Sequence, residues 1–141
     1  MKVYKGPPLQ DIKDYTMCFA CGQENPIGLK LSFRQEGETV KTEFTPGESH
    51  QGWPGIVHGG IINTLLDEAM AYAALFQELY CVTAKTEVRI RNTALVGQQL
   101  YVSAWITNKR SKLVEAKAEI ILEDGTPVAE GKATMYIVEE G

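Results

Sequence analysis

His58, Gly59 and Gly60 stand at the start of an apolar stretch that carries Asp67. A glycine pair at a helix N-terminus leaves backbone N–H groups unshielded, with the positive end of the helix dipole behind them, so it can stabilise an oxyanion. A carboxylate that is partly removed from water has a raised pKa, which suits a general base. An oxyanion hole and a base are therefore the two functions that these residues could supply.

Both features also have a plainer explanation. Glycine pairs are common in tight turns that need positive φ, and an aspartate on a helix is most often solvated. However, no lysine or arginine occurs from Gly59 to Ala84, so Asp67 has no cation on its own helix. Its neighbour Glu68 lies nearer the flank of the apolar face and is expected at the rim of the core.

The stretch from Gly59 to about Leu79 has the periodicity of a long helix. One wide apolar face is expected to form the core, and it comprises Ile61, Ile62, Leu65, Leu66, Ala69, Tyr72, Ala73 and Phe76. The opposite face is assigned Asn63, Asp67, Met70, Ala71 and Ala74. Because a helix that is apolar almost all round is buried, this second face is expected to meet another subunit or a ligand.

Alternating apolar and polar residues predict strands on both sides of this helix. Two are expected before it, over residues 29–34 and 40–44, and four after it, over residues 82–91, 99–108, 112–123 and 127–139. Residues 1–27 are irregular and no linker divides the chain, so a single α+β domain over residues 1–141 is expected. One helix cannot cover both faces of such a sheet, which is expected to wrap around the helix and to bury further surface against a second copy.

The composition limits the class of function. The net charge of −4 and the pI near 5.2 disfavour a nucleic-acid partner. The first residues lack a signal peptide, and no apolar run approaches the roughly 18 residues of a membrane helix. A cytoplasmic protein with no membrane partner is therefore expected.

The pair Cys18-x-x-Cys21 has the spacing of a zinc or redox motif. Zinc needs four ligands, and only His50, His58 and Cys81 remain as partners, with no second pair at ligand spacing. A redox motif would stand in a βαβ unit, which the strand pattern lacks. No metal is therefore expected, and the cysteines are interpreted as free structural or incidental thiols.

The segment GWPGIVHGGIINTLLDEAMA, from residue 52, resembles the motif of hotdog-fold acyl-CoA thioesterases, in the PaaI-like group of the 4-hydroxybenzoyl-CoA thioesterase superfamily. CFACGQENPIGLKLSF, from residue 18, resembles the N-terminal segment of some members, and VTAKTEVRIRNTALVGQQL and DGTPVAEGKATMYIV resemble later strands. The most specific part is His-Gly-Gly followed at fixed spacing by Leu-Asp-Glu. The resemblance implies an antiparallel sheet of about six strands around one long central helix, in homodimers that often pair into tetramers.

The resemblance also implies roles for particular residues. The backbone N–H of Gly59, supported by Gly60, would polarise the thioester carbonyl of an acyl-CoA substrate. Asp67 would be the nucleophile or general base, and Thr83 on the following strand would hold the water or the acid. His58 would orient the turn or touch the carbonyl, and capping the turn is an equal alternative. Coenzyme A is part of the substrate, so no separate cofactor is expected.

One position departs from the family pattern. Some relatives have an asparagine or glutamine in the loop before His-Gly-Gly as a second carbonyl donor. This chain has Gly52 at the matching place, with His50 and Gln51 beside it. Gln51 is the candidate for the missing donor.

The spacing of the two main groups indicates a site shared between subunits. Gly59 and Asp67 are eight residues apart, which is about 12 Å along a helix axis. An oxyanion donor and an attacking water must each lie within about 3 Å of the same carbonyl group. We therefore expect Gly59 of one subunit to face Asp67 of another.

Two other functions remain open at this stage. A related hotdog dehydratase would pair a catalytic histidine with a carboxylate in a different motif, and the only histidines are His50 and His58. A non-catalytic acyl-CoA-binding hotdog protein would not need Asp67. The acyl group of the substrate is not predicted.

Overall fold

The computed structural model describes residues 16–140 as one helix and six strands with a short 3-10 helix. In chain order these are β1 (Arg34–Glu36), β2 (Thr39–Phe44), the 3-10 helix η2 (Glu48–His50), α1 (Gly59–Leu75), β3 (Leu79–Ile90), β4 (Leu100–Arg110), β5 (Leu113–Ile121) and β6 (Pro127–Glu140). The predicted irregular segment 1–27 lies partly outside the described residues.

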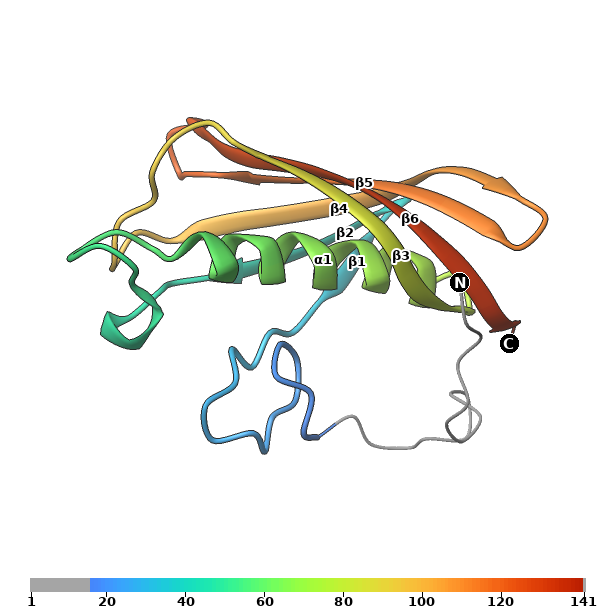
Figure 1. The fold of residues 1–141 in the computed structure, drawn as a ribbon, viewed down its shortest axis with the longest axis horizontal. Coiled ribbons are helices and arrows are strands. Elements are labelled where there is room, and N and C mark those ends of the chain that lie inside the picture. The colour runs from blue at the N-terminus through green and yellow to red at the C-terminus, as the bar shows by residue number, and fades with distance from the viewer. Residues whose placement is uncertain (1–15, 141) are drawn as a thin grey trace.

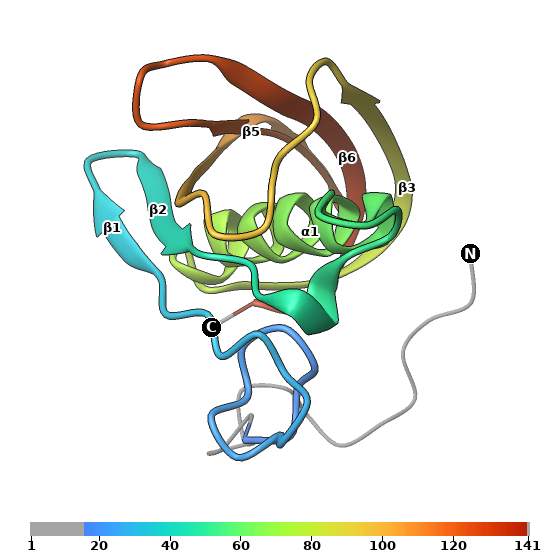
Figure 2. The same ribbon diagram turned by 90° about the vertical axis from the view of Figure 1, so that its left-hand side faces the viewer.

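The six strands form one antiparallel sheet in the order β1-β2-β4-β5-β6-β3. The helix lies against the concave face of this sheet (Figure 1). A view along the helix shows the sheet curling around it, with β1 at one edge and β3 at the other (Figure 2). The predicted α+β class and the sheet wrapped around a long helix are confirmed.

Much of the apolar face of α1 is buried against this sheet, but the burial is centred differently from the prediction. Ile61 and Tyr72 are half-buried, and Phe76, predicted to be in the core, is 38% exposed. Leu65, Leu66, Ala69, Met70 and Ala74 each have 0% exposure. The assignment of Met70 and Ala74 to the opposite face is therefore wrong. At about 100° per residue, the buried positions from Leu65 round to Ala74 span about half of the helix circumference. The curved sheet surrounds this side of the helix (Figure 2), so the core face is wider than the predicted stripe.

The helix is also shorter than predicted, and it ends at Leu75 instead of Leu79. Glu78 has a positive φ of 58°, which an α-helix does not allow. The N–H groups of Gln77 and Glu78 donate to carbonyls only three residues back, at 2.9 and 2.8 Å. This tight turn lets buried Leu79 begin β3 instead of ending the helix.

The prediction of a strand from Leu29 is wrong in its start, because β1 begins only at Arg34. Leu29 and Leu31 are buried as the alternation requires, but Lys30 between them has a φ of 54°. The N–H groups of Leu29 and Leu31 donate to the carbonyls of Phe19 and Ala20, at 2.9 and 3.0 Å. The segment is thus held by the preceding loop and not by the sheet.

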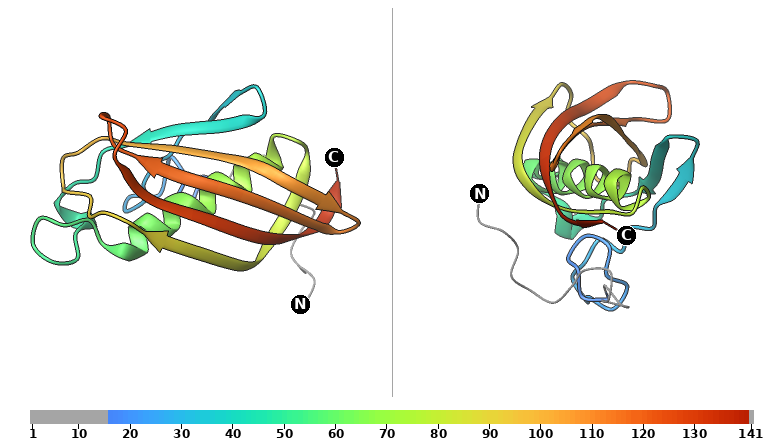
Figure 3. Two further views of the ribbon diagram at one scale, coloured as in Figure 1. Left: turned by 90° about the horizontal axis from the view of Figure 1, so that it is seen from above. Right: turned by 90° about the vertical axis from the view of Figure 1, so that its right-hand side faces the viewer.

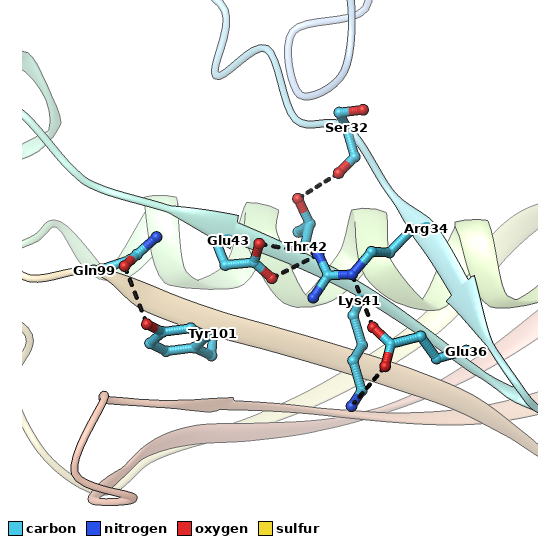
Figure 4. Close-up of polar contacts among 8 residues, drawn as sticks. All are labelled: Ser32, Arg34, Glu36, Lys41, Thr42, Glu43, Gln99 and Tyr101. Atoms are coloured by element: carbon cyan, nitrogen blue, oxygen red, sulfur yellow. Dashed lines mark hydrogen bonds and ion pairs between the residues drawn. The ribbon is translucent and has the colours of Figure 1, made fainter.

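The β1–β2 hairpin is joined by exposed ion pairs and one buried hydroxyl (Figure 4). Arg34 contacts Glu36 and Glu43, each at 2.8 Å. The buried Thr42 hydroxyl donates to the Ser32 carbonyl at 2.7 Å, which satisfies a polar group inside the core. The charged side chains and the segment that precedes β1 therefore protect this short edge of the sheet from pairing with another chain.

The opposite edge strand, β3, is long and pairs only with β6. The loop that follows β3 lies beside the loop that precedes α1 (Figure 3). The Val57 N–H donates to the Ala94 carbonyl at 2.9 Å, and Ile56 pairs with Leu95 in an isolated bridge. These contacts fix the turn at the N-terminal end of the helix.

No helix among residues 16–140 is long and apolar enough to cross a membrane. The cytoplasmic location stays a prediction.

Candidate active site

His58 caps the N-terminus of α1 with its side chain. Its backbone is extended, with φ −61° and ψ 137°, and its ring Nδ1 accepts a hydrogen bond from the Gly60 N–H at 2.8 Å. Because Nδ1 is the acceptor, the neutral ring carries its proton on Nε2. The Nε2–H group of this exposed side chain is left as a donor toward solvent.

The two glycines after His58 are required for different reasons. Neither has a positive φ, so the explanation by a positive-φ turn is wrong. A Cβ on Gly60 would lie 3.0 Å from Nδ1 and 3.2 Å from Cε1 of His58, so glycine makes room for the capping ring. A Cβ on Gly59 would meet only the Ile90 Cδ1 atom, at an ordinary 3.7 Å. Nothing within the protomer therefore demands glycine at position 59.

The N–H group of Gly59 has no hydrogen-bond partner among the described residues. It is the first N–H of the helix, with the positive end of the dipole behind it. The Gly60 N–H is occupied by His58. Of the two N–H groups expected at the oxyanion hole, only that of Gly59 is thus available, and Gly60 contributes through the cap.

A groove of about 720 Å³ opens beside this N–H group. It runs between the turn and the loop after β3, and it is lined by Gln51, Gly52, Trp53, Ile56, Val57, His58, Gly59, Ile62, Ile90, Asn92, Thr93 and Ala94. Trp53 is 80% exposed and Ile90 is 47% exposed, although both are large apolar side chains. Exposed apolar groups around a groove mark a binding surface.

Gln51, the candidate second donor, lies in this groove with its side-chain oxygen already used. Its Oε1 accepts from the Gly55 N–H at 2.6 Å, while its Nε2 has no partner within residues 16–140. Gly52 lies against the capping ring, because a Cβ there would be 3.3 Å from His58 Cδ2. A side chain at position 52 would therefore require a small shift of His58, and Gln51 stays the candidate for the second donor.

Asp67 lies on the exposed side of α1, next to the edge strand. The Thr83 hydroxyl donates to its Oδ1 at 3.3 Å. Burial of the carboxylate by the surrounding protein raises its pKa, and the hydrogen bond from Thr83 opposes this shift. No cation in the described part of the chain contributes to the shift. Asp67 is thus neither freely solvated nor paired with a charge.

Thr83 is positioned by an irregularity of β3. The register of β3 against β6 shifts between Thr83 and Lys85, so Ala84 is an extra residue in the ladder. Bulges bend a strand and redirect the side chains beside them, and they are frequent next to active sites. The bulge at Ala84 is next to Thr83, whose hydroxyl extends from β3 to Asp67 on α1.

Asp67 does not line the groove that contains Gly59. One protomer therefore holds two separate halves, a turn with a free N–H group and a carboxylate with a hydroxyl. The structure brings His58, Gly59 and Gly60 together and brings Asp67 and Thr83 together, but it does not join the two sets. Their catalytic roles stay predictions.

Comparisons with known proteins place the fold and the family. The sequence model of the thioesterase superfamily matches residues 54–129, which is more than half of the chain. The chain belongs to the thioesterase superfamily. No curated protein sequence matches it.

Several solved structures share the fold of this chain. A hypothetical thioesterase from Streptococcus pneumoniae, determined with coenzyme A, has 16% identity and a TM-score of 0.74, covering 78% of this chain and 87% of that one. The PaaI protein of the E. coli phenylacetic acid degradation operon has 18% identity and a TM-score of 0.74, covering 79% and 82%. Zebrafish thioesterase superfamily member 2 has 21% identity and a TM-score of 0.73, covering 82% and 86%.

Sequence analysis did not predict Ile90 and Asn92 as residues of the candidate site. Both line the groove, and Ile90 ends a strand whose neighbouring residues are exposed. An apolar residue at the exposed end of a strand is a detectable signal, but the groove itself depends on how two distant loops meet. Glu68 is half-buried, as expected for a rim residue, but its contact with Cys18 was not predicted.

We expect replacement of His58 by alanine to lower the free energy of unfolding by about 1 kcal/mol, the usual value of a helix N-cap. His58→Asn should recover most of this loss, because an asparagine oxygen can accept from the same N–H group. Urea unfolding followed by circular dichroism measures both variants. Equal stability of the alanine variant and the wild type would rule out the capping role.

Proposed function

We propose that this chain is an acyl-CoA thioesterase of the PaaI-like kind, which hydrolyses a coenzyme A thioester with Asp67 as base or nucleophile. The observation that carries the proposal is the Asp67–Thr83 pair, a partly desolvated carboxylate that is held by a hydroxyl and has no cation near it within residues 16–140. Such a group has little structural value, because an unpaired carboxylate loses hydration without gaining a partner charge. It is suited to accept a proton.

The reaction takes one of two courses. In the first, a water oxygen attacks the thioester carbon and Asp67 takes its proton; in the second, the Asp67 carboxylate attacks and water hydrolyses the resulting anhydride. In both, the carbonyl oxygen becomes an oxyanion, the C–S bond breaks, and coenzyme A leaves as a thiolate that takes up a proton. The unpaired Gly59 N–H supplies a donor for the oxyanion.

The complete site is assembled from two protomers. Asp67 and Gly59 are about 12 Å apart along the helix axis, so one protomer cannot place both at one carbonyl. The free edge of the long strand β3 and the exposed side chains Trp53 and Ile90 offer surface for a two-fold homodimer. Glycine at position 59, which the protomer does not require, leaves room for substrate or partner. Further pairing of dimers into a tetramer stays an expectation.

A dehydratase is the weaker alternative, because the ring Nδ1 of each histidine is already used within its own protomer. The ring Nδ1 of His50 accepts from the Gly47 N–H at 2.9 Å, as that of His58 accepts from Gly60. Both rings are thus used to fix local backbone. No ion pair between a histidine and an acid occurs within residues 16–140.

A panel of acyl-CoAs with short, long and aromatic acyl groups tests the function. We expect release of free thiol from at least one class, with a turnover that depends on the acyl group. The groove of about 720 Å³ has room for an acyl group beside Gly59. Saturable binding of acyl-CoA without any thiol release would instead support the non-catalytic alternative.

A further inference from the structure

A second cluster of reactive side chains lies where the N-terminal loop contacts α1, at the residue that follows Asp67. The Sγ atoms of Cys18 and Cys21 and a carboxylate oxygen of Glu68 all lie within 4.8 Å of one another. The Cys18 thiol donates to Glu68 Oε2 at 3.4 Å. All three residues are partly buried.

The loop that carries the two cysteines is tightly built. The Gly22 N–H donates to the Cys18 carbonyl at 2.8 Å, and the Glu24 N–H donates to the Thr16 carbonyl at 3.0 Å. A Cβ on Gly22 would lie only 2.4 to 2.6 Å from backbone atoms of Thr16 and Cys18, so no other residue fits there. The two thiols are therefore held on one side of a closed loop before any ligand arrives.

The cluster opens into a hollow of about 210 Å³, lined by Cys18, Cys21, Glu68, Ala71, Tyr72, Leu75, Leu79 and Cys81. Among residues 16–140, no lysine or arginine lines the hollow. Two thiolates and a carboxylate gathered there would repel one another unless a cation lay between them.

We propose that Cys18, Cys21 and Glu68 bind one thiophilic divalent cation, zinc, which fastens the N-terminal loop to helix α1. Two thiolates three positions apart and a carboxylate are zinc ligands, and a water facing the hollow completes the tetrahedron. Zinc–sulfur bonds of about 2.3 Å bring tetrahedral ligands within about 4 Å of one another, so the cluster needs to contract by less than about 1 Å. Binding releases the two thiol protons to solvent.

This proposal departs from the expectation that the chain has no metal site. That expectation counted cysteines and histidines only, and it placed Glu68 at the rim of the core. The carboxylate comes from a residue 50 positions beyond Cys18, and only the fold brings the two together. The inference is independent of the proposed thioesterase activity, because its test involves no substrate.

The test is a titration of the reduced, chelator-treated full-length protein with Co²⁺, which reports its ligands by absorption. We expect one Co²⁺ per chain, a thiolate-to-cobalt charge-transfer band, tetrahedral ligand-field bands, and displacement by one equivalent of Zn²⁺. The C18S and C21S variants should each weaken the charge-transfer band. Glu68→Gln should lower the affinity at least tenfold, since loss even of an outer-shell partner costs about 10- to 100-fold.

Two matched controls keep the test specific. Cys81→Ser removes a thiol that lines the same hollow, and Glu78→Gln removes an exposed acid near the end of α1. Both should leave stoichiometry and spectrum unchanged. Loss of the bound ion to a chelator should lower the Tm of the wild type but not that of the C18S/C21S double variant.

Several results would overturn the proposal. These are the absence of a charge-transfer band in the folded, reduced wild type, or a band that survives in the C18S/C21S variant. Formation of a Cys18–Cys21 disulfide in a protein that takes up no metal once reduced would also overturn it, in favour of a redox pair.

Discussion

The Asp67→Asn variant is expected to lose about 100- to 10,000-fold in kcat for acyl-CoA hydrolysis, the range that a general base contributes, with little change in KM. Asparagine has the same shape and can still meet the Thr83 hydroxyl, but it neither accepts a proton nor attacks a carbonyl carbon. Asp67 lies on the exposed side of α1 and has no ion pair with any residue that the structure describes, so the fold should not depend on its charge. Steady-state kinetics on the best substrate of the acyl-CoA panel measures the loss.

The Thr83→Val variant is the matched control for this loss. It removes the single hydrogen bond that the structure gives to the Asp67 side chain, at 3.3 Å, and keeps the carboxylate. We expect an intermediate loss of kcat, smaller than that of Asp67→Asn. Normal turnover in the asparagine variant would end the catalytic assignment of Asp67, even if the chain remains an active thioesterase.

Sequence patterns predicted the fold well where the pattern is local. The alternation of β2, β4, β5 and β6 reflects one buried and one exposed face, and this period of two is unambiguous over strands of this length. The start of β1 was mispredicted because Leu29 and Leu31 are buried by a loop, which gives the same alternation as a strand. The positive φ of Lys30 has no sequence signal, since lysine rarely adopts it.

The candidate site was predictable in its residue types but not in its geometry. His58, Gly59 and Gly60 are adjacent in sequence, so the helix cap that they form follows from local rules. The meeting of Asp67 with Thr83 depends on the path of β3 beside α1, and that of Glu68 with Cys18 depends on the return of the N-terminal loop. Such contacts depend on tertiary packing, which cannot be predicted from the hydrophobic periodicity of one sequence.

A shared site makes a second, sharper prediction: heterodimers of an Asp67→Asn chain and a Gly59→Val chain should be active, although each homodimer is inactive. The valine side chain is expected to shield the N–H group of its own residue from the substrate. Its Cβ meets only Ile90, at an ordinary distance of 3.7 Å, so the fold should tolerate it. One site of each heterodimer then combines an intact Gly59 with an intact Asp67 from the other chain. Heterodimers purified through two different affinity tags should show about half of wild-type activity per dimer.

The reciprocal heterodimer excludes other causes of recovery. It pairs a wild-type chain with a chain that carries both substitutions, so it contains the same four residues in a different distribution. If each site takes Gly59 and Asp67 from different protomers, neither of its sites is complete and it should be inactive. If each site lies within one protomer, this heterodimer should keep about half of the activity and the first should have none. The two heterodimers have identical composition. They differ only in whether the intact Gly59 and the intact Asp67 lie on the same chain or on different chains.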